Sequence, residues 1–369
     1  MKIRSDVDYC EVGTLLGKKI VVGIKEENSY IQFDAKYIDI IKEIMDNGKK
    51  EDIEDLCKEN KKMQQIYNLF KNKGYLDNNT EAKRSFNELK NIGKILKSIT
   101  CKQLVFLNRR VVRMVFSLII ILSVILIVLN LGLLKKPIDY YSMSPIQILI
   151  SILVIPCAVL GLHEIGHCLA AYSMGVKVKS ISIALFIAFP ILAVIYSGLQ
   201  LHKTRHKIWV ELGGVSMNLF LAALGLLYSN YIGESAIVRI WILANISTIL
   251  TNISFIGMTD GYFILTSLIG VNNIRLLGYQ CICKYISHKY GESNSKERIC
   301  GILLFVSIGI SFISLYTGIR YISLMFGISV RISNCIQWLF VLAMLTLFVS
   351  KLFKYKKTLD HNSIKGFDI

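Results

Sequence analysis

Long apolar runs constrain the fold of this chain more than any other feature. A helix needs about 20 consecutive apolar residues to cross a bilayer, and inside lipid it satisfies all of its own backbone groups. About six runs approach this length, at residues 112–134, 146–172, 208–228, 236–258, 300–321 and 332–353. The sequence therefore predicts a polytopic α-helical membrane protein with about six spans.

A further apolar stretch, residues 181–198, is short and is interrupted by Pro190. Irregular backbone at membrane depth is tolerated where protein or water satisfies its polar groups. Two interpretations of this stretch therefore stay open, a re-entrant hairpin and a true span.

The basic residues set the expected orientation in the bilayer. The formal net charge is +17, and Lys and Arg gather before the first run, at residues 202–207, between residues 275 and 298, and after Lys351. Such residues concentrate on the cytoplasmic side of membrane proteins, so we expect both chain ends in the cytoplasm. The abundance of Lys, Ile and Asn is typical of AT-rich bacterial genomes, and we expect a bacterial cell membrane. No basic stripe with interleaved aromatic residues stands out, which argues against nucleic acid as a partner.

The polar first part of the chain, residues 1–78, predicts a small α+β domain in the cytosol. Strand-like runs at residues 20–24 and 30–33 flank a Glu-Glu-Asn-Ser loop, which is typical of a hairpin. Apolar residues at helical spacing then predict helices at residues 36–47 and around residues 53–57 and 63–70. A hairpin with three short helices is the outline of a winged-helix domain.

The rest of the chain divides into three parts. Residues 79–110 predict a basic helical connector, residues 111–355 the transmembrane domain, and residues 356–369 a cytosolic tail.

The second apolar run carries an HExxH motif, in the sequence GLHEIGHCLA at residues 161–170. On a helix, His163 and His167 lie one turn apart and project from one face, so both imidazoles can reach a single metal ion. Glu164 lies beside them, where it could take a proton from a metal-bound water. Ionisable residues are costly inside a membrane-length apolar segment, so this group predicts a functional site.

A catalytic zinc ion needs a third protein ligand and an open position for water. His202 and His206 also have i, i+4 spacing, but they lie among basic residues that disfavour another cation, and we interpret them as part of a solvated loop. Asp260 is the better candidate, because the predicted topology brings the end of its span to the depth of the motif. Gly261 beside it would let backbone approach closely at the bend.

The motif and its partner segment together resemble the site-2 protease family of intramembrane zinc metallopeptidases. That family combines a membrane-embedded HExxH helix with a later Asn-x-x-Pro-x-x-x-x-Asp-Gly segment. Residues 252–261 read NISFIGMTDG, which keeps the Asn-to-Asp spacing but has Phe255 in place of the proline. The resemblance covers roughly residues 145–275 and extends to the small residues at Gly213 and Gly214, followed by Asn218.

The resemblance implies a role for each matched residue. His163, His167 and Asp260 would bind one zinc ion, and Glu164 would be the general base. Asn252 would steady the scissile carbonyl or its oxyanion. The alternative roles are structural: Asp260 could end a span at the interface, and Asn252 could bond to a neighbouring helix.

The N-terminal domain resembles the PqqD-like precursor-recognition modules of pathways that modify ribosomally made peptides. Such modules capture a leader peptide by adding it as a strand to a sheet edge. A winged-helix outline would also suit DNA binding, but the acidic residues within residues 51–59 argue for a peptide.

The intramembrane zinc motif and the PqqD-like domain together predict a membrane-embedded zinc endopeptidase that cleaves a ribosomally made bacterial peptide precursor. Expected partners are that precursor, the lipid bilayer, and a peptide-modifying enzyme and an exporter of the same pathway. One alternative is a regulatory intramembrane protease that cuts a transmembrane anti-sigma factor. A second alternative is a non-catalytic membrane protein for peptide export or self-immunity.

Overall fold

The computed structural model describes residues 2–49, 61–77, 90–97, 110–132, 138, 142–186, 189–253, 259–271, 273–287, 291, 293–325 and 329–363. The chain divides into two compact units. The first comprises Met1–Asp139 and Met143–Ile249, and the second comprises Tyr140–Ser142 and Leu250–Ile369.

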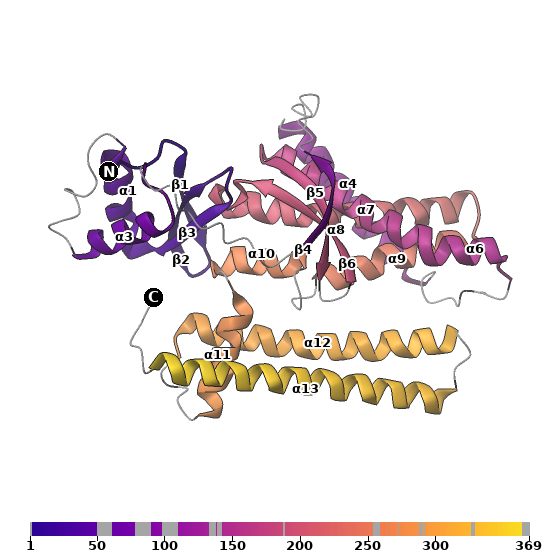
Figure 1. The fold of residues 1–369 in the computed structure, drawn as a ribbon. Helices are drawn as coiled ribbons and strands as arrows, with labels where there is room; N and C mark the ends of the chain where they lie inside the picture. The colour runs from indigo at the N-terminus through magenta and orange to yellow at the C-terminus, as the bar shows by residue number, and fades with distance from the viewer. Residues whose placement is uncertain are drawn as a thin grey trace. The chain divides into compact units, whose positions relative to one another are not determined.

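The first unit begins with a three-stranded antiparallel sheet in the order β1-β2-β3, followed by helices (Figure 1). The elements are β1 (Val7–Thr14), β2 (Gly17–Ile24), β3 (Ser29–Asp34), the 3-10 turn η1 (Ala35–Tyr37), α1 (Ile38–Gly48) and α3 (Lys61–Asn72). The predicted hairpin is confirmed, because Ile20 pairs with Phe33 and Ile24 pairs with Ser29. The predicted helix at residues 53–57 lies outside the described residues, and the winged-helix arrangement stays a prediction.

The core of this N-terminal module joins one face of the sheet to both helices. On α1 the buried residues Ile38, Ile41, Ile44 and Met45 recur at helical spacing, as the sequence predicts. Phe70 of α3 is fully buried, and its ring packs 5.6 Å from that of Tyr75.

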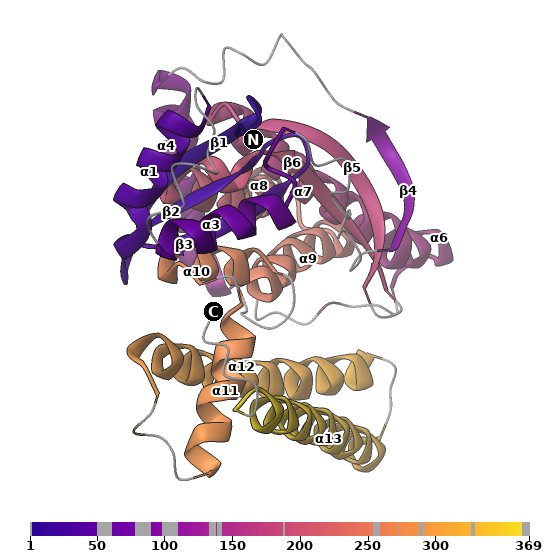
Figure 2. The same cartoon turned by 60° about the vertical axis from the view of Figure 1, so that its left-hand side comes forward.

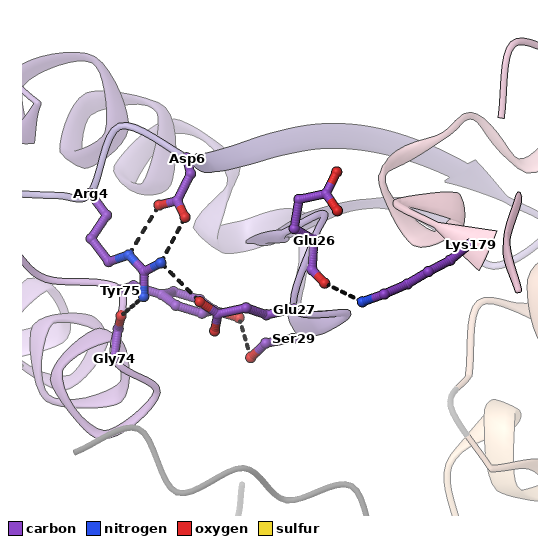
Figure 3. Close-up of polar contacts among 8 residues, drawn as sticks. All are labelled: Arg4, Asp6, Glu26, Glu27, Ser29, Gly74, Tyr75 and Lys179. Atoms are coloured by element: carbon purple, nitrogen blue, oxygen red, sulfur yellow. Dashed lines mark hydrogen bonds and ion pairs between the residues drawn. The ribbon is translucent and has the colours of Figure 1, made fainter. Parts of the chain in front are cut away.

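Arg4 holds the chain start against two other parts of the module (Figure 3). Its guanidinium donates to both carboxylate oxygens of Asp6, at 3.0 and 2.7 Å, and to Glu27 at 2.8 Å. It also donates to the carbonyl of Gly74 at 3.2 Å. These contacts link the β2–β3 turn to the segment that follows α3.

A second antiparallel sheet contains β4 (Lys90–Lys97), β5 (Lys177–Phe186) and β6 (Phe189–Ser197), with β4 alongside β5 (Figure 2). The helical connector predicted for residues 79–110 is therefore wrong over residues 90–97. The open side of β5 offers unpaired backbone groups, and pairing with them forms β4. The open alternatives for residues 181–198 resolve as a β-hairpin, with Pro190 on the edge strand β6, where a missing N–H is tolerated.

Four helices are long and apolar enough to cross a membrane, which supports a membrane protein. They are Pro145–Ser173, Thr204–Tyr231, Ala236–Ile253 and Val330–Ser350. The described apolar part of α4 (Arg110–Leu129), residues Arg113–Leu129, is shorter than these four. The predicted span at residues 300–321 lies on α12 (Ser295–Met325), which is not among the four. The total of six spans stays a prediction.

The helix of the HExxH motif is assembled from three pieces: α6 (Pro145–Leu149), a π-helical turn η3 (Ile150–Val154) and α7 (Ile155–Ser173). Ser144 caps it through a reciprocal capping box with Gln147. Pro156 lies in the first turn of α7. It has no backbone N–H and so cannot donate the hydrogen bond that a regular α-helix would have at this position. The Ile155 N–H instead bonds to the carbonyl of Ile150, five residues earlier. Single π-turns of this kind are frequent at functional sites.

The second unit contains α10 (Asp260–Ile269), α11 (Ile274–Ile286), α12 and α13 (Val330–Ser363). α12 and α13 run side by side, with α11 beside them (Figures 1 and 2). Lys284 of α11 forms an ion pair of 2.8 Å with Glu297 of α12. The predicted tail at residues 356–369 is helical as far as Ser363, and residues 364–369 lie outside the described part of the chain.

The N-terminal module packs against the segment that joins β6 to α8 (Thr204–Tyr231). Leu201, in the turn η4 (Leu199–Leu201), is buried against Val12 and Val21 of the module. Lys179 donates to the carbonyl of Glu26 at 2.9 Å (Figure 3), and Ser197 donates to that of Lys25 at 3.3 Å.

His202 and His206, interpreted from the sequence as part of a solvated loop, are half-buried in the structure. Neither residue is exposed, and their rings lie 5.8 Å apart. Burial, followed by the nearby His206, Lys25 and Lys207, lowers the pKa of His202 below its ordinary value of 6.5.

His202 should make this contact sensitive to pH. Because its pKa is lowered in the folded protein, the unfolded chain binds a proton more readily, so stability is present above pH 6.5 and falls as the pH drops below it. We expect the apparent melting temperature of the full chain in detergent to fall between pH 7.5 and 5.5. His202→Asn should reduce that fall. An equal decline in both proteins would contradict this prediction.

Candidate metal centre

Helix α7 presents the two histidines of the HExxH motif to the protein interior. His163 and His167 are 3% and 4% exposed, and their Nε2 atoms lie 3.2 Å apart. Two ligands bound about 2.0–2.1 Å from one tetrahedral ion are about 3.3 Å apart. The separation therefore fits a shared metal ion, as the i, i+4 spacing predicts.

Three glycines let α7 and α8 approach closely enough to enclose this pair. A Cβ on Gly213 would lie 2.6 Å from the carbonyl oxygen of Gly166, and a Cβ on Gly166 would meet the backbone of Gly213. A Cβ on Gly214 would fall on imidazole atoms of both histidines. Gly213 thus permits close contact between the two helices, and Gly214 leaves the space that the imidazoles occupy.

A contact from α8 fixes the orientation of His167. The Nδ1 of this residue lies 2.8 Å from the carbonyl oxygen of Val210, so Nδ1 carries the proton and donates it. The Nε2 atom then keeps its lone pair for a metal ion. Hydrogen bonds of this type orient histidine ligands and raise their basicity.

Asp260 lies at the start of α10, with Thr259 as the N-cap. The Thr259 side chain accepts from the Tyr262 backbone N–H at 3.4 Å. A carboxylate is favoured at this end of a helix, because the unpaired N–H groups give it a partial positive charge. A Cβ on Gly261 would lie 2.5 Å from the carbonyl oxygen of Ile253, so the close backbone approach predicted at Gly261 is confirmed.

The three predicted metal ligands form one buried group. One ligand atom from each of His163, His167 and Asp260 lies within 4.8 Å of the others. Asp260 is 8% exposed. No second group of this kind occurs among the residues that the structure describes. Two imidazoles and one carboxylate suit zinc and leave a fourth position open, as catalytic sites require.

The other predicted site residues are Glu164 and Asn252. Glu164 follows His163 on α7 and is half-buried. Asn252 is the penultimate residue of α9 (Ala236–Ile253) and is half-buried. Phe255, which replaces the expected proline, lies outside the described residues.

Asn218, which the sequence resemblance also includes, lies on α8. It lies one helical turn after Gly214 on α8, is fully buried, and has no hydrogen-bond partner for its amide among the described residues. Its spacing from Gly214 is the sequence signal that places it on the helix face toward α7.

Comparison of the chain with family models, with curated proteins and with solved structures gave no match.

Gly214 allows a direct test of the metal pocket. Gly214→Ala should lower the zinc bound per protein at least tenfold, because the added methyl occupies imidazole space. Gly161→Ala is the matched control, since Gly161 lies on α7 and a Cβ there meets nothing within 4 Å. Metal analysis of purified protein gives the comparison, and equal zinc content in both variants would exclude this role for Gly214.

Proposed function

We propose that this protein is a membrane-embedded zinc endopeptidase that cleaves a ribosomally made bacterial peptide precursor. The observation that carries the proposal is the buried His163, His167 and Asp260 group with Glu164 beside it in an HExxH motif. A site that holds metal for structure alone does not need a base next to its ligands.

The two histidines and Asp260 would hold the ion, and α8 would keep the pair in place through Val210 and Gly214. Zinc held there would supply Lewis-acid chemistry, which polarises a scissile carbonyl and makes the attacking water more acidic. Glu164 accepts the proton from the attacking water and delivers it to the leaving nitrogen. Asn252 is proposed to donate a hydrogen bond to the oxygen that gains charge.

The N-terminal module is proposed to hold the leader of the precursor. β3 pairs with β2 along one edge, and no described strand pairs with its other edge. An extended peptide can add there as a further strand, which raises its concentration near the protease domain. The cell membrane of a bacterium, with both chain ends in the cytoplasm, is the proposed location. A peptide-modifying enzyme and an exporter are the proposed pathway partners.

Glu164 tests whether the motif is catalytic. Glu164→Gln should keep the bound zinc and lower cleavage about 10²–10⁴-fold, the range that general acid–base catalysis contributes. Mature peptide is measured by mass spectrometry in a producing strain, and zinc is measured on purified protein. Maturation at the normal rate would refute catalysis by this motif and favour an export or immunity protein.

Asp260 tests the ligand set separately. Asp260→Ala should abolish both zinc binding and cleavage, because two histidines alone leave the site a ligand short. Glu164→Gln is the matched control, since it changes the neighbouring carboxylate but no ligand. Unchanged zinc content in Asp260→Ala would remove Asp260 from the ligand set.

A further inference from the structure

A cavity of about 1260 Å³ lies between α4 and α8, beside the end of α7. One end of this cavity is basic. It is lined by Arg113 on α4 and by Arg205 and His206 in the first turn of α8. None of its described lining residues is acidic, so this end favours an anion.

The basic side chains have different roles at this end. Arg113 is partly fixed, because it donates to the carbonyl oxygen of Ser173 at 3.1 Å. Arg205 is exposed and has no hydrogen bond or ion pair within the described part of the chain. The His206 Nδ1 atom is buried and lacks a hydrogen-bond partner among the described residues. The guanidinium of Arg205 is thus available to a bound group.

Trp209 lines both this cavity and a neighbouring one, and two contacts hold its side chain in place. Its indole N–H donates to the hydroxyl of Ser173 at 3.0 Å, and its ring packs edge-on against Phe116 at 6.2 Å. Tryptophan is enriched where the headgroup region of a membrane meets its hydrocarbon core.

The apolar part follows α4 away from the basic end. Met114, Leu118 and Ile121 line the cavity at one-turn intervals. A second cavity, of about 260 Å³, shares Ser117, Ile121 and Trp209 with the first and continues between α4 and α8 as far as Leu219. Eight residues of helix from Arg113 to Ile121 span about 12 Å, which suits much of an acyl chain.

We infer that these two cavities bind an anionic phospholipid. Its phosphate lies against Arg113, Arg205 and His206, and one acyl chain follows α4 past Trp209 into the second cavity. Charge complementarity selects the headgroup, and the continuous apolar track distinguishes a lipid from free phosphate. Because the second cavity is also lined by Gly213, the lipid lies next to the helix contact that shapes the histidine pair.

The test uses the fluorescence of Trp209 in the delipidated full chain, in neutral detergent. The sequence has three tryptophans, so Trp241→Phe and Trp338→Phe leave Trp209 as the reporter. The probes are phosphatidylglycerol and phosphatidylcholine with brominated acyl chains, which quench on contact. We expect saturable quenching by phosphatidylglycerol at a concentration at least tenfold below that needed for phosphatidylcholine.

Two variants separate the headgroup from the acyl chain. Arg205→Gln should weaken phosphatidylglycerol binding about tenfold, and Leu118→Phe should weaken it by narrowing the track. Arg331→Gln, an exposed arginine that lines neither cavity, is the matched control and should bind normally. The experiment measures lipid binding. If lipid does not bind as expected, the proposal that the protein is a protease is therefore not affected.

Three outcomes would overturn the inference. Equal quenching by both lipids would indicate unspecific contact with the surrounding bilayer. Displacement by millimolar inorganic phosphate, with Leu118→Phe unaffected, would assign the basic end to free phosphate. An Arg205→Gln protein that binds phosphatidylglycerol normally but processes precursor poorly would assign the cavity to the peptide.

Discussion

The close packing of α7 against α8 is the contact on which the rest of the site depends. Gly166 and Gly213 bring the two backbones together, and Gly214 leaves room for both imidazoles. The carbonyl of Val210 can then fix the His167 ring. In a membrane, where burial from water does not drive helices together, small residues of this kind are what permits tight association. The same contact therefore serves both the stability of the helix pair and the geometry of the candidate metal ligands.

The candidate site could be predicted from sequence because its signals are local. HExxH spacing places His163 and His167 on one helix face whatever the surrounding fold, and the Asn-to-Asp spacing points to Asp260. The contribution of Val210 could not be predicted, since a backbone carbonyl carries no sequence signature. Asn218 was visible as a polar residue in an apolar run, but its unpaired burial depends on how α8 packs.

Predictions of the fold failed where pairing between distant segments decides the structure. The hairpin of β2 and β3 follows from alternation and a turn, both local. β1 was not predicted, because its buried valines, Val7 and Val12, are five residues apart and face opposite sides of the sheet, so the strand shows no clear alternation. β4 exists through its partner β5, more than 80 residues away, so its own composition suggested a helix. The partial burial of His202 likewise depends on the N-terminal module, which the basic loop sequence does not reveal.

The π-turn at Ile150–Val154 has a geometric consequence for the helix that carries the motif. One residue added to an α-helix rotates everything after it by about 100° about the axis. The π-helical turn accommodates one such extra residue. The side chains of the helix that begins at Pro145 can therefore point in directions different from those that a continuous α-helix with the Ile155 segment would impose. The preceding stretch can then turn its own apolar side chains toward lipid without dictating which way the imidazoles face. The π-helical turn therefore lets residues 145–149 face lipid independently of the direction in which the candidate metal ligands point.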